Sequence, residues 1–133
     1  MNQTTWAVVL GLMISISLVT LAQKLETKRE PTTFALDCAE GDCPLLKGAP
    51  QTSGMRGGSV KLNPGQSVGW HSTRDNEEAL VILHGMGTAK FEGHADVPLR
   101  EKTLAYIPRE TRHNVTNTGT EILEYVWVVA PVR

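Results

Sequence analysis

Two histidines and one glutamate in this sequence have the side-chain types and the surroundings of a metal site. His71 ends a short extended run, and Glu78 begins an apolar, strand-like run that Gly85 closes. His113 begins a later strand-like run, after the polar turn that follows Pro108. Two imidazoles and one carboxylate around a divalent ion leave other coordination positions open, as in non-haem Fe(II) oxygenases. These residues therefore predict a metal site that is open to water, substrate or dioxygen.

The elements that must position these side chains are short strands separated by turns. A polar turn at residues 74–76 joins the runs that hold His71 and Glu78, so we expect the two side chains side by side on one face of a strand pair. From residue 57 onward, turns recur every eight to twelve residues, which is typical of a β-sandwich or barrel. The expected strands are 59–62, 66–71, 78–84, 88–91, 103–107, 112–116 and 121–129, with a polar connection at 92–100 and an added edge strand at 32–36.

The sequence around His71 resembles the first motif of the cupin superfamily. That motif reads Gly, five residues, His-x-His, three or four residues, Glu, six residues, Gly. His71 and Glu78 lie at ligand positions with the correct spacing, but Thr73 stands in place of the second His. The two flanking glycines are Gly65 and Gly85.

The sequence before His113 resembles the second cupin motif, which reads Gly, five residues, Pro-x-Gly, two residues, His, three residues, Asn. Pro108, His113 and Asn117 match it. Lys102 replaces the first Gly of the motif and Glu110 replaces the second. The resemblance covers residues 56–133. It implies an all-β, double-stranded β-helix, the jelly-roll barrel of small bacterial-type cupins with two cupin motifs.

The resemblance also implies that His71, Glu78 and His113 hold a divalent ion in the barrel, which could be Fe, Mn, Zn, Cu or Ni. Thr73 removes one donor, although its hydroxyl could bond a metal-bound water. His84 shares a strand face with Glu78 and is either a replacement ligand or a residue of the barrel rim. Glu110 is either the acceptor that orients His113 or an exposed turn residue. The alternative to a metal is a hydrogen-bonded polar cluster in an empty barrel.

Two classes of function remain open at this point. In the first, the protein is an enzyme that carries out dioxygenase or isomerase chemistry on a small molecule at the metal. In the second, it is a non-catalytic module that binds or senses a small molecule without a metal, since one fold hosts many activities. The resemblance implies a homodimer. The net charge of −1 gives no indication of nucleic acid as a partner.

The amino-terminal residues 1–22 are expected to form a signal peptide or membrane anchor, as a hydrophobic helix that precedes the fold. Residues 6–22 carry no charge, and as a helix they would span roughly 25 Å, compared with roughly 30 Å for a bilayer core. We expect export to the periplasm or outside the cell, either after cleavage behind Ala22 or tethered through residues 6–22. Because basic residues follow the apolar run and none precedes it, an uncleaved anchor with a cytoplasmic domain is the alternative.

Residues 23–55 are expected to be a linker and lead-in to the cupin domain at 56–133. This segment contains both cysteines of the chain, Cys38 and Cys43. In an exported protein they would form a disulfide, and closing so short a loop contributes only about 2 kcal/mol. The alternative is a dithiol that serves redox chemistry or binds a metal. The length of 133 residues leaves room for one domain.

Overall fold

The region that can be described begins behind the amino-terminal apolar segment. A computed structural model describes residues 29–132 of the chain. The chain divides into two units, Met1–Pro31 and Thr32–Arg133, and all strands found in the described residues lie in the second. The predicted signal or anchor at residues 1–22 lies outside the described residues. Within residues 29–132, no helix has the length and apolar character needed to cross a membrane.

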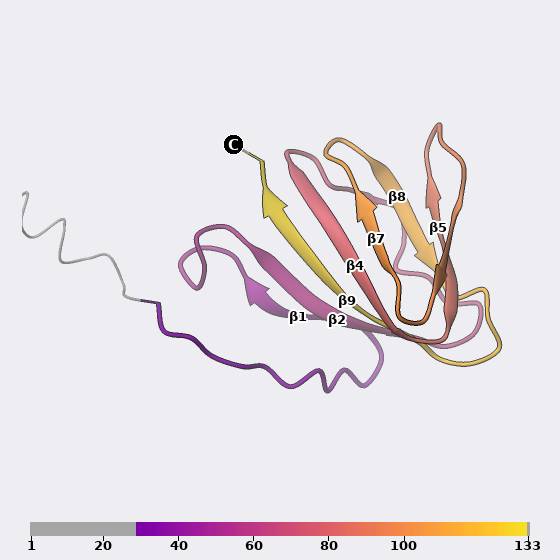
Figure 1. The fold of residues 1–133 in the computed structure, drawn as a ribbon, viewed down its shortest axis with the longest axis horizontal. Helices are drawn as coiled ribbons and strands as arrows, with labels where there is room; N and C mark the ends of the chain where they lie inside the picture. Colours follow the sequence, from indigo (N-terminus) through magenta and orange to yellow (C-terminus); the bar gives the residue numbers. More distant parts are fainter. Residues whose placement is uncertain (1–28, 133) are drawn as a thin grey trace, which may run out of the picture. The chain divides into compact units, whose positions relative to one another are not determined.

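The described residues form nine strands arranged in two antiparallel sheets (Figure 1). The five-stranded sheet has the order β1-β2-β9-β4-β7, and the four-stranded sheet has the order β3-β8-β5-β6. The strands are β1 (Gly41–Lys47), β2 (Arg56–Leu62), β3 (His71–Ser72), β4 (Asn76–His84), β5 (Met86–Phe91), β6 (Val97–Arg100), β7 (Leu104–Ile107), β8 (Arg112–Thr116) and β9 (Leu123–Pro131). The all-β prediction is confirmed.

The strand expected at 66–71 is wrong in extent: it is reduced to β3 (His71–Ser72), preceded by an isolated bridge between Ser67 and Thr116. Two further strands, β1 and β6, were not predicted, and both are edge strands that contain a proline. The edge strand expected at residues 32–36 is not a strand; β1 takes the edge position, and its pairing with β2 is irregular after Pro44. The polar connection expected at residues 92–100 contains β6, in which Pro98 pairs with Thr88 of β5. Proline cannot donate a backbone hydrogen bond, so it is tolerated at a sheet edge. The sequence prediction had placed these residues in a linker and in a polar connection, so both strands were missed.

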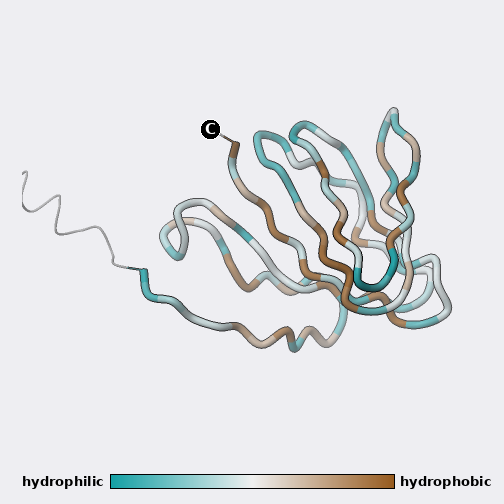
Figure 2. Tube along the Cα trace, viewed as in Figure 1, coloured by the Kyte–Doolittle hydropathy of each residue, from teal (hydrophilic) through white to brown (hydrophobic). Residues whose placement is uncertain are grey.

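The inward-facing side chains change character along the barrel. At one end β2, β4 and β9 contribute apolar side chains, and Figure 2 shows the most hydrophobic stretches along β4 and β9. At the other end the same strands contribute polar or charged side chains, such as Arg56 in β2 and Glu78 in β4. One end of the barrel is therefore a packed core and the other is a cavity. The buried core consists of Val60, Leu62, Leu80, Ile82, Ala89, Leu99, Ile107, Val115, Leu123 and Tyr125.

The two positions where this chain lacks a motif glycine keep the backbone conformation that glycine favours. Lys102 has φ 62° and Glu110 has φ 57°, both in the left-handed region. Gly65, which matches its motif position, has φ 82°. A left-handed residue with a β-carbon is strained by roughly 1–2 kcal/mol. The turns of the fold are thus retained at Lys102 and Glu110 despite their intrinsic cost.

Candidate metal centre

The three predicted ligands converge from both sheets. His71 in β3 pairs directly with His113 in β8, so the two histidines are neighbours in the four-stranded sheet. Glu78 lies in β4 of the five-stranded sheet. The prediction that His71 and Glu78 lie side by side on paired strands is therefore wrong. The turn between them carries the chain from one sheet to the other, and the two side chains meet across the barrel.

The ligand atoms of these residues lie close enough to share one ion. One nitrogen of each histidine and one carboxylate oxygen of Glu78 are all within 4.8 Å of one another. His113 Nε2 is 3.3 Å from Glu78 Oε2, and the two imidazole rings have centroids 4.2 Å apart. His113 and Glu78 are buried, with 0% and 7% of their side chains exposed, whereas His71 is exposed. The cluster is thus buried on one side and reachable from solvent at His71.

Backbone carbonyls fix the orientation of both imidazoles. His71 Nδ1 lies 2.9 Å from the carbonyl oxygen of Gly69, and His113 Nδ1 lies 3.3 Å from that of Thr111. A carbonyl oxygen only accepts hydrogen bonds, so Nδ1 must carry the proton in each ring. The other nitrogen, Nε2, then presents a lone pair. This is the arrangement in which protein imidazoles bind metals.

The buried Nε2 atom of His113 tests whether these residues fit a metal ion. It makes no hydrogen bond with any described residue, although it faces the Glu78 carboxylate. A lone pair buried against a carboxylate is unfavourable, and either a proton on Nε2 or a metal cation between the two groups relieves it. Metal–nitrogen and metal–oxygen bonds of 2.0–2.2 Å place neighbouring ligand atoms about 3.0–3.4 Å apart, which includes the 3.3 Å separation. The residues present therefore fit a divalent ion.

Thr73 has a structural contact that the sequence did not predict. Its hydroxyl donates to the carbonyl oxygen of Pro108 at 2.9 Å and accepts from the amide of Thr111 at 3.0 Å. The side chain is 4% exposed. It therefore connects the first motif to the turn of the second motif. Since its one proton is already donated, Thr73 does not serve as a donor to a metal-bound water, contrary to that expectation.

The two other predicted site residues lie apart from the cluster. His84 is half exposed and lies between the carboxylates of Glu101 and Glu121, at 3.4 and 3.6 Å. It is a residue of the barrel rim and does not replace the missing ligand. Glu110 is exposed and pairs with Arg109 at 3.3 Å, while the carbonyl of Thr111 takes the role that had been suggested for Glu110.

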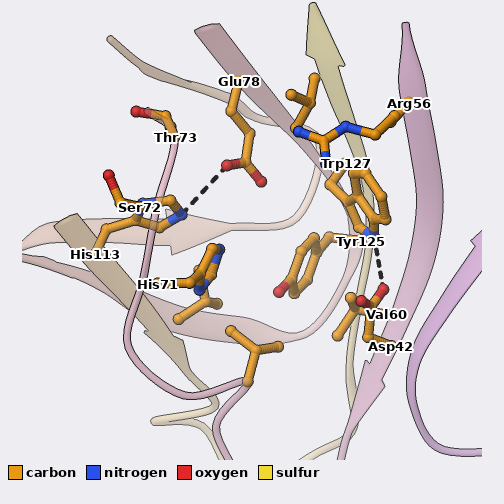
Figure 3. A pocket seen from close by; sticks show the side chains of 13 residues that line it. Asp42, Arg56, Val60, His71, Ser72, Thr73, Glu78, His113, Tyr125 and Trp127 are labelled. Atoms are coloured by element: carbon orange, nitrogen blue, oxygen red, sulfur yellow. Dashed lines mark hydrogen bonds and ion pairs between the residues drawn. The ribbon is translucent and has the colours of Figure 1, made fainter. Parts of the chain in front are cut away.

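A cavity of about 190 Å³ adjoins the cluster (Figure 3). At roughly 30 Å³ per liquid water molecule, it has room for about six waters or for a ligand of similar size. Its walls combine the cluster with aliphatic, aromatic and charged side chains. The lining residues are Asp42, Arg56, Val60, Val68, His71, Ser72, Thr73, Glu78, His113, Val115, Tyr125, Trp127 and Val129.

Sequence reasoning missed two charged residues of this cavity. Arg56 faces inward because it lies two and four positions before the inward-facing Gly58 and Val60 of β2, but the predicted strand began only at Ser59. Asp42 lies in β1 and accepts a hydrogen bond from Trp127 Nε1 at 2.7 Å. Alternation along a longer β2 could have identified Arg56, whereas no local signal pointed to Asp42.

Two aromatic residues of β9 complete the wall that faces the histidines. Tyr125 is 3% exposed, and burial, followed by the charge of Glu78, raises its pKa well above the ordinary value. The hydroxyl therefore keeps its proton at neutral pH. Trp127 lies across Gly58 of β2, where an added β-carbon would be 3.0 Å from the indole and 2.5 Å from the carbonyl oxygen of Cys43. Glycine at position 58 is what permits this close packing of β1, β2 and the indole.

The two cysteines form a disulfide in this structure. Cys38 and Cys43 have their α-carbons 5.7 Å apart, and Cys38 is buried. Cys43 belongs to β1, so the bond joins the edge of the five-stranded sheet to the segment before it. Asp42 lies inside the closed loop, and the disulfide therefore constrains a residue of the cavity wall.

Comparison with known proteins places this chain in a family. The family model described as "Cupin domain" matches residues 58–129, and the chain belongs to the cupin family. The predicted double-stranded β-helix is confirmed by solved cupin structures that share it. One of the most similar is a Bacillus halodurans protein, with a TM-score of 0.67 and 17% identity over 80% of this chain and 86% of that one.

Two further matches come from Thermotoga maritima. The chain is 34% identical over 70 residues to an oxalate-binding protein, covering 53% of this chain. It spans 57% of the length of that curated relative. The solved structure of a predicted oxalate decarboxylase has a TM-score of 0.56 and 20% identity, over 76% of this chain and all of that one.

Proposed function

We propose that this protein is a cupin that binds one divalent metal ion through His71, Glu78 and His113, and that holds a small acid beside the ion. One observation carries the metal proposal: the buried Nε2 of His113 faces a carboxylate without any hydrogen bond in the described residues. The alternative of a hydrogen-bonded polar cluster would require that atom to be satisfied. A donor set of two imidazoles and one carboxylate suits Fe, Mn, Zn, Cu or Ni.

The side chains of this chain would hold and orient both ion and ligand. The two carbonyl-bound imidazoles present fixed lone pairs, and the Glu78 carboxylate lowers the net charge of the ion by one. When bound, a divalent ion of this kind would supply Lewis acidity or, if redox-active, a site for dioxygen. The aliphatic side chains of the lining, Val60, Val68 and Val115, would exclude water from the part of the ligand that they contact.

Oxalate is the first ligand to test. It is the ligand in the name of the relative that is 34% identical, and its six heavy atoms match the room of the cavity. We propose that the protein binds oxalate without breaking it down. Apart from the three metal ligands, the titratable side chains that line the cavity are Asp42, Arg56 and Tyr125, and Asp42 is engaged by Trp127. Breakdown of oxalate in aerobic assays would convert the binding proposal into an enzymatic one.

The decisive experiment measures metal content and metal affinity of the full-length chain. The variants are His71→Ala, Glu78→Gln and His113→Ala, with His94→Ala as a control, because His94 is an exposed histidine in a turn outside the cluster. We expect near-stoichiometric metal in the parent and the control, and a loss of at least 10-fold in affinity for each cluster variant. A folded parent that takes up none of the five ions would refute the metal proposal.

We also propose that the domain is exported and that it forms a homodimer. The Cys38–Cys43 disulfide supports export, since such bonds persist in oxidising compartments. An apolar patch on the outer face of β4 and β7 supports pairing, because Val81 lies opposite Leu104 and both are exposed. Cell fractionation tests the first proposal. Light scattering of the parent and of Leu104→Glu tests the second, which fails if the parent is already a monomer at micromolar concentration.

A further inference from the structure

Some polar side chains of the cavity form hydrogen bonds or ion pairs with the protein, and others form none. Thr73 and Asp42 are hydrogen-bonded as described above, and the Ser72 hydroxyl accepts from the amide of Arg74 at 3.1 Å. His71 and His113 each contact a backbone carbonyl, and Glu78 lies against His113. Among the polar residues that line the cavity, only Tyr125 and Arg56 have no side-chain hydrogen bond or ion pair with any described residue.

These two side chains project from one wall. Tyr125 lies in β9 and Arg56 in β2, which are paired in the five-stranded sheet, whereas both histidines come from the four-stranded sheet. Figure 3 shows the hydroxyl of Tyr125 directed toward the side of the cavity where His71 lies, and the guanidinium of Arg56 beside Trp127. Arg56 is exposed and Tyr125 is buried. The cavity thus offers an uncommitted O–H donor inside and an uncommitted cation at its edge.

We propose that Tyr125 and Arg56 form a second anchor for the ligand, which binds the part of a small anion that points away from the metal ligands. This inference rests on the proposed function. A phenol hydroxyl that keeps its proton and a guanidinium both donate hydrogen bonds, so the matching group is an acceptor with negative charge. A carboxylate is such a group, and Arg binds it with charge-assisted hydrogen bonds.

The position of the anchor restricts the ligand to short acids with two oxygen-bearing ends. One end must reach the ion, and the other must reach the wall formed by β2 and β9. A cavity of about 190 Å³ leaves room for a ligand of roughly four to eight heavy atoms beside its contacts. Oxalate, glycolate and malonate meet this description and differ in length and in the charge of the second end. A water molecule in the cavity is the competing partner of the Tyr125 hydroxyl.

The test is calorimetric titration of metal-loaded, full-length protein with each of these three acids. We expect Tyr125→Phe, which removes only the hydroxyl, to weaken the best-bound acid about 2- to 10-fold. Arg56→Gln removes the charge, and we expect it to weaken binding about 10-fold or more and to reduce the dependence of binding on salt. Arg100→Gln is the matched control, because Arg100 is exposed in β6 and does not line the cavity.

The possible results test the anchor proposal and the metal proposal independently. Equal affinity of the parent and both variants would assign the Tyr125 hydroxyl to a water and overturn the anchor. Metal binding without binding of any of the three acids would overturn the anchor and leave the metal proposal standing. If Tyr125→Phe lost the metal, the side chain would support the metal ligands instead, which also overturns the anchor. If the parent bound no metal, the proposed function would fail, and the anchor would then stand only if Tyr125→Phe and Arg56→Gln still weakened acid binding.

Discussion

Replacing Thr73 by valine should destabilise the protein far more than its place in a cavity wall suggests. Valine has nearly the same shape but lacks the hydroxyl. The change removes the hydrogen bonds to Pro108 and Thr111 and leaves the Thr111 amide without its side-chain partner in a buried position. Two hydrogen bonds contribute about 0.5–1.5 kcal/mol each, and a buried donor without a partner costs about 1–3 kcal/mol. The expected loss in the free energy of unfolding is therefore about 2–4 kcal/mol.

Urea denaturation followed by circular dichroism measures this loss, and thermal unfolding should show a Tm lower by about 10–20 °C for a domain of this size. Thr73→Ser is the matched control, because it keeps the hydroxyl and removes one methyl group, at a cost of about 1 kcal/mol. The reasoning is refuted if valine costs less than serine, or if both cost the same. The Thr73 hydroxyl would then contribute nothing to stability, and the residue would only fill the position where the motif has its second His.

Three further predictions follow from the turns, the disulfide and the buried tyrosine. Lys102→Gly should stabilise the fold by about 0.5–1 kcal/mol by relieving left-handed strain, while Gly65→Ala should destabilise it by about 1–2 kcal/mol, both in urea titrations; the opposite signs would show that φ does not dominate these turns. The double variant Cys38→Ser, Cys43→Ser should lose about 2 kcal/mol relative to the oxidised protein, and reducing agent should produce the same loss in the parent but no change in the variant. Because the pKa of Tyr125 is raised, the native state holds a proton that the unfolded chain releases above about pH 10, so stability should be unaffected below that pH and should fall above it by up to about 1.4 kcal/mol per pH unit. Tyr125→Phe should reduce that slope, and the remainder should come from Tyr106, because the hydrogen bond that it donates to Glu77 also raises the pKa of its hydroxyl. An unchanged slope in the variant would assign the alkaline loss to groups other than Tyr125.

Much of the candidate site could be predicted because its positions are fixed by local sequence spacing. The turn at Gly65, the ligands His71 and His113 and the capping residue Asn117 each follow from short motifs. Asn117 shows why: its amide donates to the carbonyl of Glu121 and its oxygen accepts from the amide of Gly119, so these spacings are set by one turn. Residue types and turn geometry can both be predicted when the residues concerned are only a few positions apart in the sequence.

The parts that could not be predicted depend on which strands become neighbours. No residue in the turn after His71 indicates that Glu78 continues in the other sheet. The pairing of β4 with β9 depends on partners that are 40 or more residues away in the sequence. The role of Thr73 was missed for the same reason, since Pro108 and Thr111 are distant in sequence. Asp42 reaches the cavity only because β1 adds to the edge of the sheet. That strand was not predicted, and a sequence that contains Pro44 does not indicate one.

Because apolar side chains are concentrated at one end of the barrel, the two ends should differ in how readily they open locally. Amides near Leu80, Ile82 and Leu123 are covered by the packed end, whereas those near His71 border the cavity and a strand of two residues. Hydrogen–deuterium exchange should therefore be slow at one end and faster at the other, within the same sheets. Opening at the cavity end can then admit a ligand on a shorter timescale than global unfolding. Entry and exit would not require the core to separate, so the rate of exchange of ligand and the kinetic lifetime of the fold can vary independently.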